Sequence, residues 1–262
     1  MIELLRLPVA DSYKYIKVEG REHVDQALLR KKGVILLAMH FGSWELCNFI
    51  PQLFNHSYKV VVNPQKRYTK LNDLLDSYRQ KAGAGLLIPG SGAREFVQTL
   101  KDGEMVGMVV DQGGKTGNLA KFFGRDASMS IGAIKMGLKL DVAVCFCVLV
   151  RDKGPYHRLI IEPPLEFKKN GNLDADIDHA LSGVVSTMES YIKKYPSEYM
   201  WFYKIWKYSK ESAIVILNDK KMGHLHQALA FANGIKQALA EREIYSQIEV
   251  IDVEFKDKVK EK

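Results

Sequence analysis

The sequence has 262 residues, of which 47% are hydrophobic and 26% are charged; this is the balance of a globular protein and excludes a disordered or collagen-like chain. No run approaches the roughly 18 apolar residues of a transmembrane helix, and the three cysteines lack the spacing of a disulfide framework. The net charge of +7 is uneven, because residues 1–210 carry +8 and residues 211–262 carry −1. The first part therefore favours an anionic partner, such as an acidic protein, an anionic leaflet or nucleic acid, unless its lysines only keep the surface soluble.

Hydrophobic periodicity predicts strands that alternate with helices along residues 20–206. The predicted strands are residues 34–39, 58–62, 86–88, 105–110, 142–150 and 158–162, and the predicted helices are residues 20–31, 69–82, 93–100, 130–140 and 174–194, with two more starting at Ser43 and Pro196. The turn signal at residues 152–155 predicts a hairpin between the last two strands. This order predicts an α/β fold with a mixed, largely parallel central sheet flanked by helices.

The C-terminal tail has a pattern of its own. Residues 213–217 form an apolar strand, a helical pattern opens at Gly223, and residues 247–253 form another strand. One short βαβ-like unit is too small to bury a good core alone. We therefore predict a first domain over residues 1–210 and a partial second domain over residues 211–262.

His40 is the leading candidate for chemistry. It follows the predicted strand at its C-terminal end, where open α/β sheets place their sites, and Gly42 permits a tight turn before Glu45. Split between a loop and a helix start, the two side chains can converge, so that the carboxylate orients the imidazole. The alternative is a strand-end histidine with a glutamate that only favours the helix dipole.

Asp111 and Gln112 end another predicted strand, on the same edge as His40 if the strands are parallel. Gly113 and Gly114 follow them and permit a ligand to approach the backbone. An ordinary strand-to-loop turn uses the same residue types, so position alone leaves both interpretations open.

Five motifs in order resemble the bacterial lipid A biosynthesis (lauroyl/myristoyl) acyltransferase family, over about residues 13–210. They are Gly33–Leu46 with its H-x-x-x-x-E pattern, Asp111-Gln112, Phe122-Phe123-Gly124, Glu162-Pro163-Pro164 and the aromatic-basic run 196–207. The resemblance implies a glycerolipid-acyltransferase-like fold, with His40 as general base and Glu45 as its orienter. It also implies a substrate site that includes Asn63, Arg94, Asp111 and Gln112, although Asn63 stands where the family has an arginine.

The resemblance further implies transfer of a fatty acyl chain from an acyl carrier protein thioester to a hydroxyl of a lipid A precursor or related glycolipid. The resemblance implies no cofactor other than the phosphopantetheine that carries the acyl donor. It implies neither a metal ion nor a nucleic-acid partner.

The expected location is peripheral, on the cytoplasmic face of the bacterial inner membrane. The family usually has an N-terminal anchor, so either it is absent here or the chain is incomplete. A catalytically silent module that binds anionic lipid or carrier protein is the alternative function, and coenzyme A is the alternative acyl donor.

Aromatic and basic residues alternate near the end of the first domain. Trp201, Phe202, Tyr203 and Trp206 are interleaved with Lys204, Lys207 and Lys210, and Phe122–Arg125 forms a second such patch. Core packing is the commonest role of such a stretch, followed by membrane contact and base stacking.

The tail resembles a second family. Residues 216–229 resemble the opening of the ELM-type (mitochondrial-fission-like) putative glycosyltransferases. Those proteins continue for hundreds of residues, so we expect a glycosyltransferase-like fragment without glycosyl transfer. His224 and His226 lack the partners of a metal site.

Overall fold

The computed structural model describes residue 11 and residues 13–64, 67–88, 90 and 93–253. Its centre is a seven-stranded sheet in the order β1-β9-β8-β2-β5-β3-β4. The strands are β1 (Ile16–Glu19), β2 (Val34–Ala38), β3 (Tyr58–Val61), β4 (Gly85–Leu87), β5 (Met105–Val109), β8 (Ala143–Arg151) and β9 (His157–Pro164). All neighbouring strands are parallel except β8 and β9. The predicted mixed, largely parallel sheet is confirmed.

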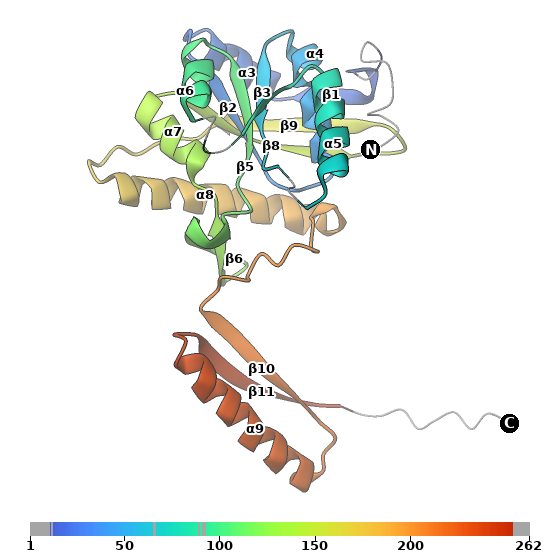
Figure 1. Cartoon of the computed structure of the whole chain (residues 1–262), viewed down its shortest axis with the longest axis vertical. Coiled ribbons are helices and arrows are strands. Elements are labelled where there is room, and N and C mark those ends of the chain that lie inside the picture. Colours follow the sequence, from blue (N-terminus) through green and yellow to red (C-terminus); the bar gives the residue numbers. More distant parts are fainter. Residues whose placement is uncertain (1–10, 12, 65–66, 89, 91–92, 254–262) are drawn as a thin grey trace, which may run out of the picture.

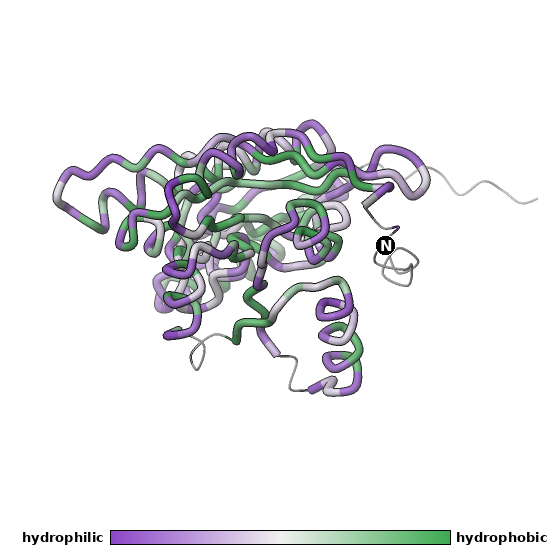
Figure 2. Tube along the Cα trace, turned by 90° about the horizontal axis from the view of Figure 1, so that it is seen from above, coloured by the Kyte–Doolittle hydropathy of each residue, from purple (hydrophilic) through white to green (hydrophobic). Residues whose placement is uncertain are grey.

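Helices cover both faces of this sheet, and the alternation of side chains along β2 shows why. Ile35 and Leu37 pack against α6 (Ala93–Lys101), α7 (Gly132–Leu140) and α8 (Leu173–Lys194). Val34 and Leu36 pack on the other face, against α3 (Arg21–Leu28), the 3-10 helix η2 (Trp44–Phe49) and α4 (Ile50–Phe54). A strand that is buried on both faces has a continuous apolar sequence. In Figure 2 the hydrophobic segments lie mostly in the interior of the molecule.

Several predicted elements differ in the structure. The helix expected from Ser43 is η2 followed by α4, and Ser43 makes no capping hydrogen bond. The helix expected from Pro196 is only the 3-10 turn η4 (Pro196–Glu198), followed by turns to residue 208. Two features were not predicted: β1, and the hairpin of β6 (Asn118–Phe122) with β7 (Arg125–Met129). Phe122 in that hairpin is fully buried, so the predicted patch at 122–125 is in part core.

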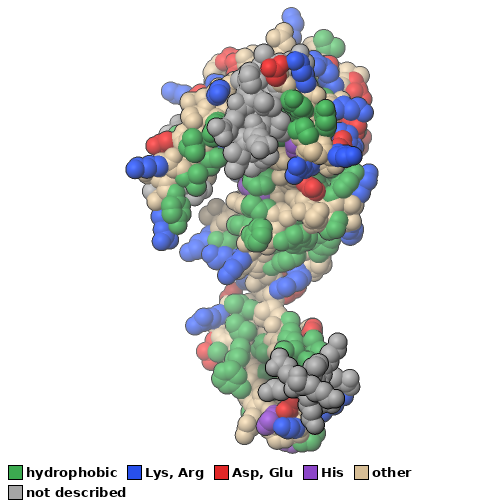
Figure 3. Space-filling view, turned by 90° about the vertical axis from the view of Figure 1, so that its right-hand side faces the viewer, with side chains coloured by type: hydrophobic (Ala, Val, Ile, Leu, Met, Phe, Trp, Pro, Cys, Tyr) green, Lys and Arg blue, Asp and Glu red, His purple; other side chains and the backbone are tan. Residues whose placement is uncertain are grey.

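The tail forms a two-stranded sheet of its own. β10 (Glu211–Asn218) and β11 (Tyr245–Asp252) pair in parallel across α9 (Met222–Ala240), and the unit lies apart from the seven-stranded sheet (Figure 1). Its polar links to the first part include Glu211, which meets Lys121 at 2.7 Å and accepts from Arg125 through its carbonyl. Lys210 also contacts the tail, because its Nζ donates to Glu243 at 3.0 Å and its carbonyl accepts from the N–H of Tyr245 at 2.6 Å. Val215, Leu217, Phe231 and Ile251 are exposed, and hydrophobic side chains are visible on its surface in Figure 3.

We propose a domain boundary at about residue 210, and deletion of residues 212–262 tests it. Because neither core cluster of the first part includes a residue of the deleted segment, we expect the melting temperature of the remainder to change little. Thermal unfolding of both chains provides the measurement. Unfolding of residues 1–211 after deletion would show that the tail is integral to the first domain.

Candidate active site

His40 lies in a short turn that follows the C-terminal end of β2, and backbone hydrogen bonds to other segments hold this turn in place. The backbone carbonyl of His40 accepts from the N–H of Met200 at 3.1 Å. Two residues later, the Gly42 N–H donates to the carbonyl of Glu198 at 2.8 Å, and the Ser43 N–H donates to the carbonyl of Leu149 at 3.3 Å. The turn is therefore held from β8 and from the segment after α8.

Gly42 is expected to be indispensable to this turn. Its φ is +58°, and a Cβ atom would lie 2.0 Å from the Leu149 carbonyl oxygen. We expect Gly42→Ala to destabilise the protein by about 2 kcal/mol or more in urea unfolding. Gly154 has the same φ with nothing within 4 Å of a Cβ, so Gly154→Ala should cost only about 1 kcal/mol. Equal costs for the two variants would contradict this account.

Asp111 is the hydrogen-bond partner of His40. Its Oδ1 lies 2.8 Å from His40 Nδ1, and its Oδ2 accepts from the backbone N–H of His40 at 3.0 Å. β2 and β5 are parallel neighbours, so their C-terminal ends bring these residues together although they are 71 positions apart. An ionised carboxylate only accepts hydrogen bonds, so the proton sits on Nδ1 and leaves Nε2 as the basic nitrogen.

Aromatic rings enclose this pair. Trp44 contacts the imidazole edge-on, with ring centroids 5.2 Å apart. Tyr199 is buried, and burial followed by the charge of Asp111 raises the pKa of its hydroxyl. The carboxylate of Asp111 is 2% exposed and the imidazole is 16% exposed. The imidazole is therefore open to a ligand, while the carboxylate that it contacts is shielded from water.

Glu45 has a different partner from the one predicted. Its carboxylate accepts from Arg79 of α5 (Thr69–Lys81), from Nε at 3.0 Å and from Nη2 at 2.5 Å, and Asn48 Nδ2 donates to it at 3.1 Å. In the part of the chain that the structure describes, no hydrogen bond joins His40 to Glu45. The contact with His40 that was expected from Glu45 is instead made by Asp111, because the 3-10 turn of η2 directs Glu45 towards α5.

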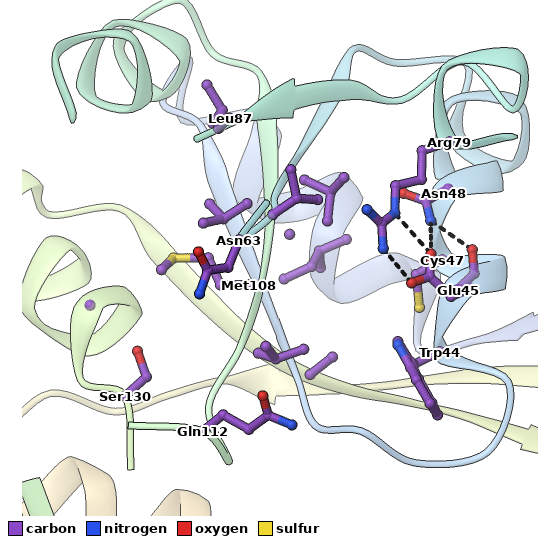
Figure 4. A pocket seen from close by; sticks show the side chains of 18 of the residues that line it. Trp44, Glu45, Cys47, Asn48, Asn63, Arg79, Leu87, Met108, Gln112 and Ser130 are labelled. Carbon is purple, nitrogen blue, oxygen red and sulfur yellow. Dashed lines mark hydrogen bonds and ion pairs between the residues drawn. The ribbon is translucent and has the colours of Figure 1, made fainter. Parts of the chain in front are cut away.

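A cavity of about 750 Å³ opens beside His40, at the C-terminal ends of β2, β5, β3 and β4. Figure 4 shows its polar side, where Glu45, Asn48 and Arg79 gather, across from Asn63, Leu87 and Met108. Most of the remaining wall is apolar, including Leu36, Val60, Leu75, Phe96 and Met136. A cavity of this size, apolar with a few convergent polar groups, is typical of a ligand site.

Comparison with known proteins decides the family. The family model described as bacterial lipid A biosynthesis acyltransferase matches residues 1–208. The chain belongs to this family. It is 24% identical over 198 residues to a lipid A biosynthesis palmitoleoyltransferase of Escherichia coli K12, covering 74% of this chain and 62% of that protein.

Two further relatives are also named as acyltransferases, one of them for a different lipid. A lipid A biosynthesis acyltransferase of Haemophilus influenzae is 24% identical over 201 residues, covering 73% of this chain and 59% of that protein. A phosphatidylinositol mannoside acyltransferase of Mycobacterium tuberculosis is 23% identical over 155 residues, 54% of this chain and 48% of that protein. The chain thus spans about three fifths, or less, of the length of these relatives.

The predicted substrate residues of this lipid A acyltransferase family member are not all in the cavity. Asn63 and Gln112 line it. Arg94 is exposed on the first turn of α6 and is not among the lining residues. Ser43 is buried, and its hydroxyl lies 3.0 Å from Nε2 of His157. Arg79 was not predicted as a site residue, yet it is the arginine that lines the cavity among the described residues; no local pattern marks it in its amphipathic helix.

Proposed function

We propose that this protein transfers a fatty acyl chain from an acyl carrier protein thioester to a hydroxyl of a glycolipid. The observation that carries the proposal is the hydrogen bond between His40 and a shielded Asp111, at the wall of a largely apolar cavity. This is the arrangement of a general base and its orienter. It occurs in a chain whose family is named for acyl transfer in lipid A biosynthesis.

In the proposed reaction, His40 Nε2 removes the proton of the acceptor hydroxyl as its oxygen attacks the thioester carbonyl carbon. The carbon–sulfur bond then breaks, and the departing thiolate takes the proton back from the imidazolium. Asp111 stabilises that imidazolium. The step needs no acyl-enzyme, and Ser43 is not placed to form one, because it is buried against His157.

Charge and relatives support the choice of substrates. The +8 charge of residues 1–210 suits an acidic carrier protein and an anionic membrane surface. The Escherichia coli relative is named for lipid A biosynthesis and the Mycobacterium tuberculosis relative for a phosphatidylinositol mannoside. Both names indicate glycolipids, so we propose a glycolipid acceptor, with lipid A precursors as the first to be tested.

A lipid mass-shift assay tests this function. The protein is incubated with acyl carrier protein or coenzyme A thioesters and a total bacterial lipid extract, and each lipid is examined for the added acyl mass. We expect a glycolipid to gain one acyl group, faster from the carrier protein donor. No gain from any donor, with vesicle binding intact, would favour a catalytically silent lipid-binding module.

We propose that the Trp201–Lys207 loop contacts the membrane, on its cytoplasmic face. Among the described residues, no helix is both long and apolar enough to span a bilayer. Phe202 is 99% exposed and Trp201 is 46% exposed, and the neighbouring Lys204 and Lys207 are exposed as well. Ile205 and Trp206 instead pack inward. Rings and cations in this arrangement suit the interface of an anionic leaflet.

We expect Phe202→Ser to weaken binding to anionic vesicles by about three- to tenfold, because it removes the most exposed ring. Vesicle sedimentation measures the binding. Leu29→Ser is the matched control, since Leu29 is also exposed beside basic residues but lies at the opposite end of β2. A larger loss of vesicle binding in Leu29→Ser than in Phe202→Ser would place the membrane contact at the N-terminal end of β2 instead.

A further inference from the structure

The polar side of the cavity has an unusual charge balance. Among the described residues that line the cavity, the charged side chains besides His40 are Glu45 and Arg79. Arg79 donates twice to Glu45, and its Nη1 donates to Asp76 Oδ1 at 2.8 Å. Glu45 and Arg79 are 14% and 16% exposed. The guanidinium is therefore shared between two carboxylates before any ligand arrives.

This sharing leaves the polar side negative. Burial acts to lower the pKa of Arg79, but the hydrogen bonds and charges of Glu45 and Asp76 outweigh it and raise the pKa. The guanidinium thus stays cationic beside two carboxylates, and Asp111 adds a third behind His40. Like charges in a poorly hydrated site repel strongly. A phosphate or carboxylate placed against Glu45 would meet more negative than positive charge.

The same side offers hydrogen-bond acceptors. Asn48 donates its amide N–H groups to the backbone and carboxylate of Glu45 at 2.7 and 3.1 Å. Its Oδ1 has no hydrogen-bond partner among the described residues, but it is shielded from solvent, so the acceptors that a ligand can reach are the carboxylate oxygens of Glu45. A group that brings O–H donors matches this wall, whereas a phosphate dianion brings only acceptors.

We propose that the Glu45–Arg79–Asp76 side of the cavity binds an uncharged, hydroxyl-bearing headgroup and discriminates against phosphate and carboxylate. This inference rests on the proposed function and narrows its acceptor to a sugar or other polyol hydroxyl. Any phosphate of the acceptor lies outside this side of the cavity. Arg79 then serves to hold Glu45 rather than to bind an anion.

Binding of two amphiphiles with the same alkyl chain provides the test. Octyl glucoside carries a neutral polyol and octyl phosphate an anion, and each is titrated below its critical micelle concentration. The readout is the part of the tryptophan fluorescence change that disappears in Trp44→Phe, because Trp44 lines the cavity. We expect octyl glucoside to bind at least about tenfold more tightly. Equal or tighter binding of octyl phosphate would overturn the inference.

A charge-removing pair of variants makes the test specific. Asp76→Asn keeps the shape of its side chain and removes one carboxylate charge from Arg79, so the preference for the glucoside should fall by about threefold or more. Asp152→Asn is the control. It removes a carboxylate whose Oδ1 lies 2.8 Å from Arg158 Nε, outside the cavity, so it should leave the preference for the glucoside unchanged. An unchanged preference in a folded Asp76→Asn protein would contradict the proposal. Because binding needs no turnover, a protein that prefers the glucoside but transfers no acyl group would overturn only the proposed function.

Discussion

His40→Ala is expected to lower the turnover number for acyl transfer by about 10²–10⁴-fold or more, with the fold intact. The imidazole is the group at the cavity whose free nitrogen can accept a proton, because Nδ1 is held by Asp111. The loss should appear in kcat rather than in the affinity for lipid. Transfer to a purified acceptor, followed by mass spectrometry under single-turnover conditions, measures it.

The control for this variant is another histidine. His179 is exposed on α8 and is not among the residues lining the cavity, so His179→Ala should transfer at the original rate. Circular dichroism and thermal unfolding of both variants exclude a folding defect. An active His40→Ala protein would remove His40 from the mechanism.

Asp111→Asn is expected to cost about 10²–10⁴-fold in kcat. The replacement keeps the size of the side chain, but its NH₂ group can hydrogen-bond only to an unprotonated Nδ1. It therefore favours the wrong imidazole tautomer and no longer stabilises the imidazolium. Because Asp111 is 2% exposed, water cannot replace it. The pH profile of kcat should move as well, since the charge beside the base is lost.

The variant Glu45→Gln distinguishes the role of Glu45 from that of Asp111. It frees Arg79 from a charge partner without touching the bond between His40 and Asp111, so we expect a smaller loss in kcat and a larger change in acceptor affinity. A greater kcat loss for Glu45→Gln than for Asp111→Asn would make Glu45 the orienter during turnover. The two variants are best compared in one assay, with the same donor and acceptor.

The sequence by itself determined the elements whose signal is local. The branched apolar run at 34–39 predicts β2 because a strand covered on both faces needs no polar alternation. The helical spacing of residues 69–82 and 174–194 predicts α5 and α8 within a few residues. Because the strands are separated by helices, their order predicts the parallel sheet, and hence that His40 and Asp111 end at one edge. β1 was missed because its four residues pair only with the distant β9.

Only the tertiary structure decided how the side chains pair at the site. Glu45 lies five positions from His40, yet it pairs with Arg79, 34 residues away, while His40 pairs with Asp111, 71 residues away. The choice depends on the 3-10 turn of η2 and on the approach of α5, which no periodicity encodes. Likewise, Phe122 is buried and Phe202 exposed, although both stand in aromatic-basic runs. Local patterns specify elements, but partners and burial arise when distant elements pack together.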